Sequence, residues 1–283
     1  MTSDDHALAH ELATAAGRVL LNLRAQPHPT TKELRDAGDR AAHEFLVAAL
    51  AEHRPDDAVL SEESHGDEAG TPASRLRSRR VWIVDPLDGT REFAEAGRYD
   101  WAVHVALWAR TEGAPNGDLV AGAVALPAQG VTLSTLDPPR LPTAGSDGMR
   151  ITVSRTRPPA FVERLAESLD ATLVPLGSAG AKIAAVLQGK VDAYVHAGGQ
   201  YEWDTAAPVA VVRAAGLHAS RIDGSAVTYN HEDPTLPDIL VCRSSLAPRL
   251  LAGIRAVDDD AAGAGGKVVS PDHDAERESR HAS

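Results

Sequence analysis

Two carboxylates three positions apart stand at the end of an apolar run in "VWIVDPLDGTREF", residues 81–93. The proline between Asp85 and Asp88 fixes φ, and the glycine that follows allows close backbone approach, so the turn is rigid. The two carboxylates can then converge, and the carbonyl of Leu87 can point the same way. Such oxygens are the ligands that Mg²⁺ prefers. Because Asp, Pro and Gly are also common in turns, a plain turn and a cation site both remain open at this point.

The residues that follow could bind an anion. Gly89, Thr90 and Arg91 offer successive backbone N–H groups at the start of "TREFAEAG". Unpaired N–H groups at the start of such a segment can hold a phosphate. One short loop would then hold a cation and a phosphate together.

Two further acidic motifs favour the cation site. Glu62 and Glu63 lie in "LSEES" just past a predicted strand, where a solvated acidic loop is the alternative. Asp204 lies in "EWDTAAPVAVVRAAG" at a predicted helix start, where Asp is often only an N-cap. Trp203 before it and the alanines after it indicate burial, however, and a buried charge needs a partner. A metal ion is one such partner, because no lysine or arginine lies nearby in the sequence.

Electrostatics decides what a cluster of these groups could bind. Unit charges about 4 Å apart repel by roughly 4 kcal/mol at an effective dielectric constant near 20. Four carboxylates in one pocket would therefore be unstable and would repel a phosphate. Two or three divalent cations would turn the same pocket into a phosphate receptor, which is the two-metal arrangement for in-line phosphoryl displacement.

Composition limits the remaining choices. The 283 residues are 43% apolar, enough for one large domain or two fused halves. The formal net charge of -12 argues against a nucleic-acid surface, although a bound metal can invert the charge locally for a small anion. Cys242 is the single cysteine, so a reducing compartment is favoured. Neither a signal peptide nor a membrane span is evident, so we expect a cytoplasmic protein that binds no membrane.

The N-terminal half, residues 1–140, must carry the first two acidic motifs. Hydrophobic periodicity predicts helices over residues 4–25 and about 36–51. Strands are predicted in "DAVLSEES", "RVWIVDP", "WAVHVALWAR" and "DLVAGAVALPAQGVTLSTL", with a basic, flexible stretch at residues 71–80. Prolines and glycines mark a connection near residues 137–149.

The C-terminal half, residues 150–255, alternates strands with helices. The strands are "RITVSRT", "ATLVPLG" and "VDAYVHA", and the helices are "PAFVERLAESL", "AGAKIAAVLQG" and "DTAAPVAVVRAAG". This alternation favours layered sheets covered by helices. Residues 256–283 are rich in Gly, Asp and Ser and are interpreted as a disordered tail, with Asp258 to Asp260 as solvated charge.

The three acidic motifs together resemble a known family. "SEE", "WIVDPLDGTREF" and "EWDTAAPVAVVRAAG" occur in the order and separations of the inositol monophosphatase superfamily. Within it, "DGTREF" and "GSAGAK" resemble the 3′(2′),5′-bisphosphate nucleotidases of the bacterial CysQ type. The resemblance covers roughly residues 5–250 and implies the layered αβαβα sugar-phosphatase fold, an α+β or α/β arrangement.

The resemblance assigns roles to the acidic residues. It implies that Glu62, Asp85, Asp88 and Asp204 bind two or three Mg²⁺ ions, with the carbonyl of Leu87 as a fifth ligand. Glu63 would lie behind these ligands or at the surface.

The resemblance also implies a pair that activates water. Thr90 would pass a proton toward Asp39 of "AGDRAAHEF" as the attacking water reaches phosphorus. The residues alone favour an aspartate at a helix start, and only the family pattern gives Asp39 a catalytic role. The backbone N–H groups of Gly89 and Thr90 would hold the transferred phosphate.

Substrate contacts are implied in the second half. Lys182 of "GSAGAK" matches a family lysine near the second phosphate of the nucleotide, with Ser178 to Gly180 in the same loop; the alternative is an exposed helix lysine. Two positions depart from the family pattern. Arg157 stands where histidine is usual, and His196 stands where several relatives have arginine. A neutral imidazole holds phosphate less firmly than a guanidinium, which leaves room for broader sugar-phosphate activity.

The expected activity is removal of the 3′-phosphate from adenosine 3′,5′-bisphosphate, giving AMP and phosphate, in sulfate assimilation. The alternatives are the same chemistry on inositol phosphate or fructose 1,6-bisphosphate, or a non-catalytic protein that binds metal or nucleotide. The family further implies a homodimer and inhibition by lithium.

Overall fold

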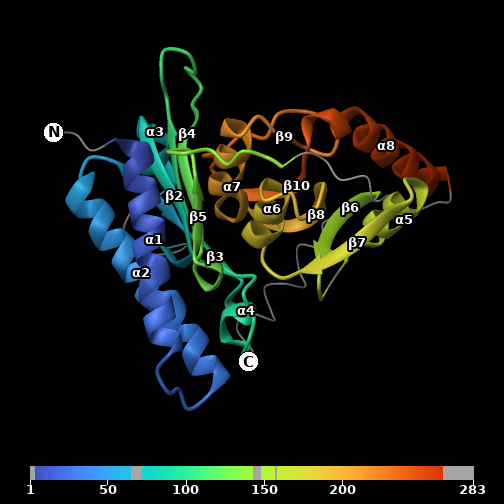
Figure 1. Ribbon diagram of the computed structural model, residues 1–283. Helices are drawn as coiled ribbons and strands as arrows, with labels where there is room; N and C mark the ends of the chain where they lie inside the picture. Colours follow the sequence, from blue (N-terminus) through green and yellow to red (C-terminus); the bar gives the residue numbers. More distant parts are fainter. Residues whose placement is uncertain (1–3, 65–71, 143–147, 157, 264–283) are drawn as a thin grey trace.

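The computed structural model describes residues 4–64, 72–142, 148–156 and 158–263 (Figure 1). Two five-stranded sheets and three layers of helices alternate, which confirms the predicted αβαβα architecture. Within the described residues, no helix is both long enough and apolar enough to cross a membrane.

The first sheet is formed by the N-terminal half. Its strands follow one another in the order β1-β2-β3-β4-β5, with β1 and β2 parallel and the other neighbours antiparallel. Their bounds are β1 Ala58–Ser61, β2 Arg80–Asp88, β3 Ala102–Ala109, β4 Asp118–Leu126 and β5 Val131–Ser134.

Helices α1 (Asp5–Arg24) and α2 (Thr31–His53) cover the outer face of this sheet. Helix α2 begins five residues earlier than predicted. Thr30 and Glu33 form a capping box there, in which each side chain accepts from the other residue's backbone N–H. The prediction located the helix by its apolar residues and overlooked this polar start signal.

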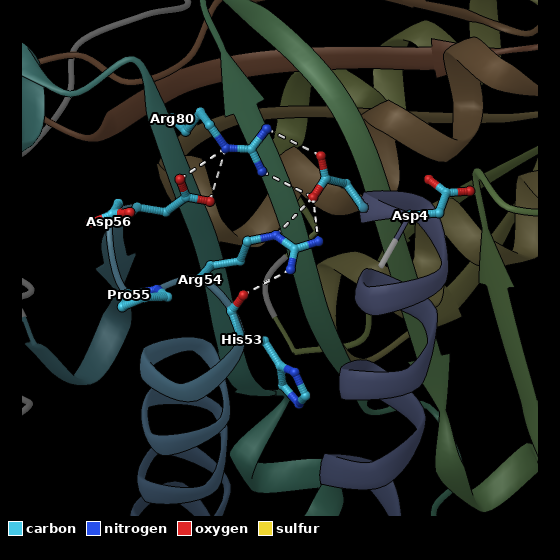
Figure 2. A pocket seen from close by; sticks show the side chains of 8 residues that line it. Asp4, His53, Arg54, Pro55, Asp56 and Arg80 are labelled. Carbon is cyan, nitrogen blue, oxygen red and sulfur yellow. Dashed lines mark hydrogen bonds and ion pairs between the residues drawn. The ribbon is translucent and has the colours of Figure 1, made fainter. Parts of the chain in front are cut away.

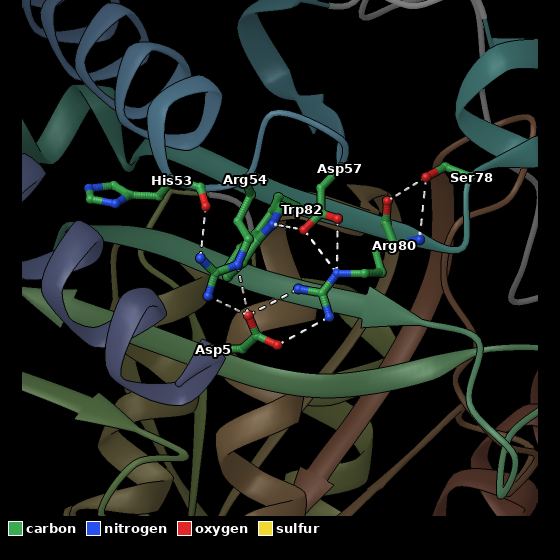
Figure 3. A network of polar contacts seen from close by, with 7 residues as sticks. All are labelled: Asp5, His53, Arg54, Asp57, Ser78, Arg80 and Trp82. Atoms are coloured by element: carbon green, nitrogen blue, oxygen red, sulfur yellow. Dashed lines mark hydrogen bonds and ion pairs between the residues drawn. The ribbon is translucent and has the colours of Figure 1, made fainter. Parts of the chain in front are cut away.

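A polar network fastens the edge where α1 and the end of α2 meet β2 (Figures 2 and 3). Asp5 accepts hydrogen bonds from the guanidinium groups of Arg54 and Arg80 at 2.9 to 3.1 Å. Asp57 accepts from Arg80 and from the indole N–H of Trp82, both at 2.9 Å. Each charge in this network faces an opposite one. We therefore interpret the network as a structural feature that holds α1 and the end of α2 against β2.

The second sheet is formed by the C-terminal half, in the order β7-β6-β8-β10-β9. β6 is parallel to β7 and β8, whereas β10 is antiparallel to β8 and β9. The bounds are β6 Met149–Ser154, β7 Ala171–Leu176, β8 Ala193–Tyr201, β9 His218–Ser220 and β10 Thr235–Cys242.

Helices α6 (Ala179–Leu187) and α7 (Glu202–Ala214) lie between the two sheets. Their apolar side chains share one core with side chains of both sheets, for example Ile83 of β2, Val209 of α7 and Ile239 of β10. Helices α5 (Ala160–Ser168) and α8 (Ala247–Gly263) cover the far face of the second sheet. The middle layer therefore joins the two halves.

Two sequence predictions are wrong at their boundaries. Part of the stretch expected to be flexible forms helix α3 (Pro72–Arg77). The disorder expected from residue 256 is wrong as far as residue 263, because α8 continues to Gly263 and Val257 is buried in the core of α5, α8 and the second sheet. Residues 264–283 lie outside the described residues. The short elements are α4 Thr90–Ala94 and the 3₁₀ helices η1 Glu62–Ser64, η2 Pro127–Gln129 and η3 Ser244–Leu246.

Candidate metal centre

Asp85 and Asp88 lie at the C-terminal end of β2 and are both buried. Residues three apart in a regular strand point to opposite faces of the sheet. Here the pairing of β2 with β3 shifts by one residue between Asp85 and Asp88, which is a β-bulge. The bulge accommodates the extra residue and lets both carboxylates face the same side. The backbone N–H of Leu87 donates to Asp85 at 3.0 Å, as expected for a tight polar turn.

Asp204 reaches the same place from the start of α7. One carboxylate oxygen from each of Asp85, Asp88 and Asp204 lies within 4.8 Å of the other two. The pKa of Asp85 is raised well above its usual range, first by burial and then by the negative charges of Glu62, Asp88 and Asp204. The structure thus brings together three carboxylates from two distant motifs, and Glu62, from a third motif, lies near enough for its charge to act on Asp85.

The start of α7 is held from several directions. The backbone N–H of Tyr201 donates to Asp204 at 2.7 Å. Glu202 is fully buried and accepts from the backbone N–H groups of Asn230 and His231 at 2.7 and 2.8 Å. The guanidinium of Arg75, from α3 in the other half, donates to the side chain of Asn230. Asp204 therefore sits on a fixed helix end.

Asp39 and Thr90, which the resemblance implies act as a pair, are hydrogen-bonded to each other. The hydroxyl of Thr90 donates to Asp39 Oδ1 at 3.3 Å, and the carbonyl of Leu87 is an alternative acceptor at 3.3 Å. Asp39 lies inside α2, so the alternative of a helix-start residue is wrong. Burial and the nearby charge of Glu63 raise the pKa of Asp39 to about 7.

Asp88 also connects this loop to α6 in the other half. Its two oxygens accept from the backbone N–H groups of Ala179 at 3.2 Å and Gly180 at 2.5 Å, which are unpaired donors of the first helical turn. Gly89 lies against the same turn, since a Cβ there would be 2.7 Å from the Cβ of Ser178. Its φ of 87° also favours glycine.

Lys182 is buried within this cluster, so the alternative of an exposed helix lysine is wrong. Its ammonium donates to the carbonyl of Gly177 at 2.6 Å and lies 5.4 Å from the ring of Tyr194. Burial lowers its pKa, while the charges of Asp88 and three other carboxylates oppose that shift. It supplies the positive charge near Asp204 that was not visible in the local sequence.

The remaining residues singled out in the sequence are Arg91, His196 and Arg157. Arg91 has an exposed side chain, so its backbone N–H is the part that belongs to the loop. His196 donates from Nε2 to the carbonyl of Gly198 at 2.7 Å, and burial followed by the charge of Lys182 lowers its pKa to about 4. It is therefore neutral at physiological pH. Arg157 lies outside the described residues.

Sequence reasoning missed three buried polar residues around the centre. His104 of β3 lies beside Asp88, with 3.3 Å between its Nε2 and Oδ2 of Asp88. Asp100 accepts from the backbone N–H of Gly177 at 2.6 Å, and Glu92 accepts from Arg155 at 2.9 Å. His104 could have been noticed as a polar residue within the otherwise apolar run "WAVHVALWA".

The donor set fits a hard divalent cation. Buried carboxylates destabilise one another unless a positive charge compensates them, as the raised pKa of Asp85 shows. Oxygen ligands from carboxylates and a backbone carbonyl are those that Mg²⁺ prefers. An added cation would remove the repulsion and favour binding of an anion.

The family is established by comparison with known proteins. A model of the inositol monophosphatase family matches residues 3–258, and the chain belongs to this family. A phosphatase superfamily was also the expectation from the three acidic motifs, and that expectation is confirmed.

Relatives with assigned activities are found among the bisphosphate nucleotidases. The chain is 51% identical to the 3′-phosphoadenosine 5′-phosphate phosphatase of Mycobacterium leprae, over 89% of this chain and 94% of that protein. It is 31% identical to the 3′(2′),5′-bisphosphate nucleotidase CysQ of Escherichia coli, over 71% of this chain and 81% of that protein. The crystal structure of CysQ from Bacteroides thetaiotaomicron superimposes with a TM-score of 0.69 at 26% identity, covering 85% of this chain and 97% of that one.

Proposed function

We propose that this protein is a Mg²⁺-dependent phosphatase that removes the 3′-phosphate from adenosine 3′,5′-bisphosphate, giving AMP and phosphate. The observation that carries the proposal is the convergence of Asp85, Asp88 and Asp204 within 4.8 Å in a chain of this family. The name of the 51% identical relative supports the choice of substrate.

Each acidic residue has a role in the proposal. Glu62, Asp85, Asp88 and Asp204 would hold two or three Mg²⁺ ions, with the carbonyl of Leu87 as a further ligand. When bound, the ions supply charge compensation for the phosphate and a nucleophile at neutral pH.

Asp39 and Thr90 would handle the proton of the attacking water. The hydroxyl of Thr90 lies between Asp39 and the carbonyl of Leu87, so it can accept a proton from water while it donates its own toward the carboxylate. A general base works best when its pKa is near the operating pH, and the pKa of Asp39 is about 7.

The substrate would bind where the two halves meet. The backbone N–H groups of Gly89, Thr90 and Arg91 would hold the phosphate that is removed, and Lys182 would attract the second phosphate. Ser178, the N-cap of α6, and Gly180, in the first turn of α6, pack against the loop that carries these N–H groups. His196 would contact the substrate as a neutral hydrogen-bonding group and not as a cation.

A phosphate-release panel tests this function. Adenosine 3′,5′-bisphosphate, inositol 1-phosphate and fructose 1,6-bisphosphate are compared with and without Mg²⁺, and with added Li⁺. We expect the nucleotide to be hydrolysed fastest and only with Mg²⁺. The proposal is wrong if the nucleotide is the slowest substrate, and nucleotide binding without hydrolysis would favour a non-catalytic binding protein.

Several wider expectations rest on the family resemblance or, for the location, on the sequence composition. Inhibition by Li⁺ is tested in the same panel. A homodimer, a cytoplasmic location and a place in sulfate assimilation stay predictions.

A further inference from the structure

One buried histidine lies beside two carboxylates of the proposed metal centre and contacts the start of α7. His104 is fully buried on β3, directly opposite Asp85 in the pairing with β2. Its Nδ1 is 3.0 Å from the backbone carbonyl of Trp203, the residue before Asp204. Its Nε2 is 3.3 Å from Oδ2 of Asp88. A single ring thus lies between the loop of the first half and the helix start of the second.

The contact with Trp203 fixes the orientation of the ring. A backbone carbonyl can only accept a hydrogen bond, so Nδ1 of His104 carries the hydrogen and donates it. Nε2 is consequently the atom directed at Asp88. Nδ1 also lies 4.0 Å from Oδ2 of Asp85, so the imidazole borders both carboxylates of the β2 loop.

Helix α6 packs against the other side of the ring. A Cβ at Gly180 would lie 1.9 Å from Nε2 of His104 and 2.8 Å from Oδ2 of Asp88. The absence of a side chain at Gly180 is therefore what lets its backbone N–H reach Asp88 at 2.5 Å. His104 and Gly180 together leave Asp88 little freedom to rotate.

If the side chain at position 104 served packing alone, an apolar residue would fill the space at a lower free-energy cost. Nε2 of His104 is buried and faces Oδ2 of Asp88 at 3.3 Å, and a buried polar atom is expensive in a protein core unless it is paired. The neighbours that share its face of β3, Ala102 and Ala106, are apolar. Packing volume alone therefore does not explain the imidazole at position 104.

We propose that His104 is a positioning residue of the metal centre, which holds Asp88 and the start of α7 at the separation that cation binding requires. The inference rests on the proposed function, because it assumes that Asp88 and Asp204 bind the same group of ions. Residues that orient metal ligands typically change metal affinity by about 10- to 100-fold when they are replaced.

Direct Mn²⁺ binding tests this role apart from catalysis. Metal-free protein is titrated with Mn²⁺, and electron paramagnetic resonance measures the concentration of Mn²⁺ that stays free. The wild type is compared with His104→Leu, His104→Asn and His104→Gln. Leu keeps the volume and apolar character, Asn keeps a donor toward the carbonyl of Trp203, and Gln keeps an amide directed at Asp88. We expect His104→Leu to lower the Mn²⁺ affinity by about 10- to 100-fold, with Asn and Gln in between.

A matched control separates positioning from packing. Leu107 is fully buried on the opposite face of the same strand, in the core with α1 and α2. Leu107→Ala should lower the Tm and leave the Mn²⁺ affinity unchanged. In the His104 variants, the Mg²⁺ concentration for half-maximal activity should rise, while the KM for substrate at saturating Mg²⁺ stays the same.

Two results would overturn the inference in distinguishable ways. If His104→Leu and His104→Asn both bind Mn²⁺ within twofold of the wild type, His104 is a core residue and the proposed function is unaffected. If the wild type binds no Mn²⁺, the proposed function itself fails, and the role of His104 fails with it.

Discussion

Replacing Asp39 by asparagine should stabilise the metal-free protein while it lowers turnover by about two to four orders of magnitude. Asn keeps an oxygen that can accept from the hydroxyl of Thr90, so the geometry at 3.3 Å is preserved. What Asn removes is a buried negative charge. Burial and the charge of Glu63 raise the pKa of Asp39 to about 7, so the folded state resists its ionisation.

The magnitude follows from proton linkage. The pKa of Asp39 is 3.8 in an unperturbed chain and about 7 in the fold, so the folded state binds the extra proton between these values. The free energy of unfolding of the wild type therefore falls as pH rises from about 4 to 7. Each pKa unit corresponds to about 1.4 kcal/mol, which gives an upper value of about 4 kcal/mol. We expect Asp39→Asn to gain about 1 to 4 kcal/mol at pH 8 and nothing near pH 3.

Urea unfolding with EDTA, at several pH values between 3 and 8, measures this difference. Asp36→Asn is the matched control, because Asp36 lies on the same helix with an exposed side chain paired to Lys32. The control should change stability by less than about 0.5 kcal/mol at any pH. Phosphate release should fall about 10²- to 10⁴-fold in Asp39→Asn if the carboxylate acts as a base. A gain in stability that does not depend on pH would refute the linkage argument.

Three further substitutions probe the rest of the site. Asp88→Asn should reduce turnover by at least about two orders of magnitude with an unchanged circular dichroism spectrum, because it removes metal charge balance and not core packing; near-normal activity with unchanged Mg²⁺ demand would contradict this assignment. Lys182→Met should raise the KM for adenosine 3′,5′-bisphosphate about 10-fold or more, because that is the affinity lost with one charged hydrogen bond. The KM for adenosine 3′-monophosphate should be unchanged. Equal effects on both substrates would show that Lys182 does not bind the second phosphate. Gly180→Ala should destabilise the protein by about 1 to 3 kcal/mol in urea, because its Cβ would overlap Nε2 of His104; Gly113→Ala, with no atom within 4 Å of its Cβ, should be nearly neutral, and a similar loss in both would refute the overlap.

The layered fold could be predicted because local signals and global architecture agree. The alternation of strands with helices in the second half gave the element order, which the structure confirms. Element ends were less predictable. The start of α2 depends on the polar capping box at Thr30, and α8 continues past residue 256 because Val257 packs on the outer core.

The site was predictable in part because its acidic residues occur in motifs. The convergence of Asp85 and Asp88 depends on the β-bulge opposite β3, which a pattern of residue types does not specify. His104 could not be recognised from the sequence for a related reason. Its importance comes from a contact with Trp203, which lies 99 residues away in the sequence. Lys182 was recognised by its motif, but its burial beside the carboxylates was not.

The proposed centre also couples cation binding to the packing of the two halves. Asp88 accepts from the first turn of α6, and His104 donates to the first turn of α7, so the contacts that gather the carboxylates are the contacts that join the halves. Without a cation, the repulsion that raises the pKa of Asp85 opposes this junction. A cation that binds the folded state at 100 times its Kd would stabilise it by about 2.7 kcal/mol. Mg²⁺ should therefore protect the backbone N–H groups of Ala179 and Gly180 from hydrogen exchange more than those of α1.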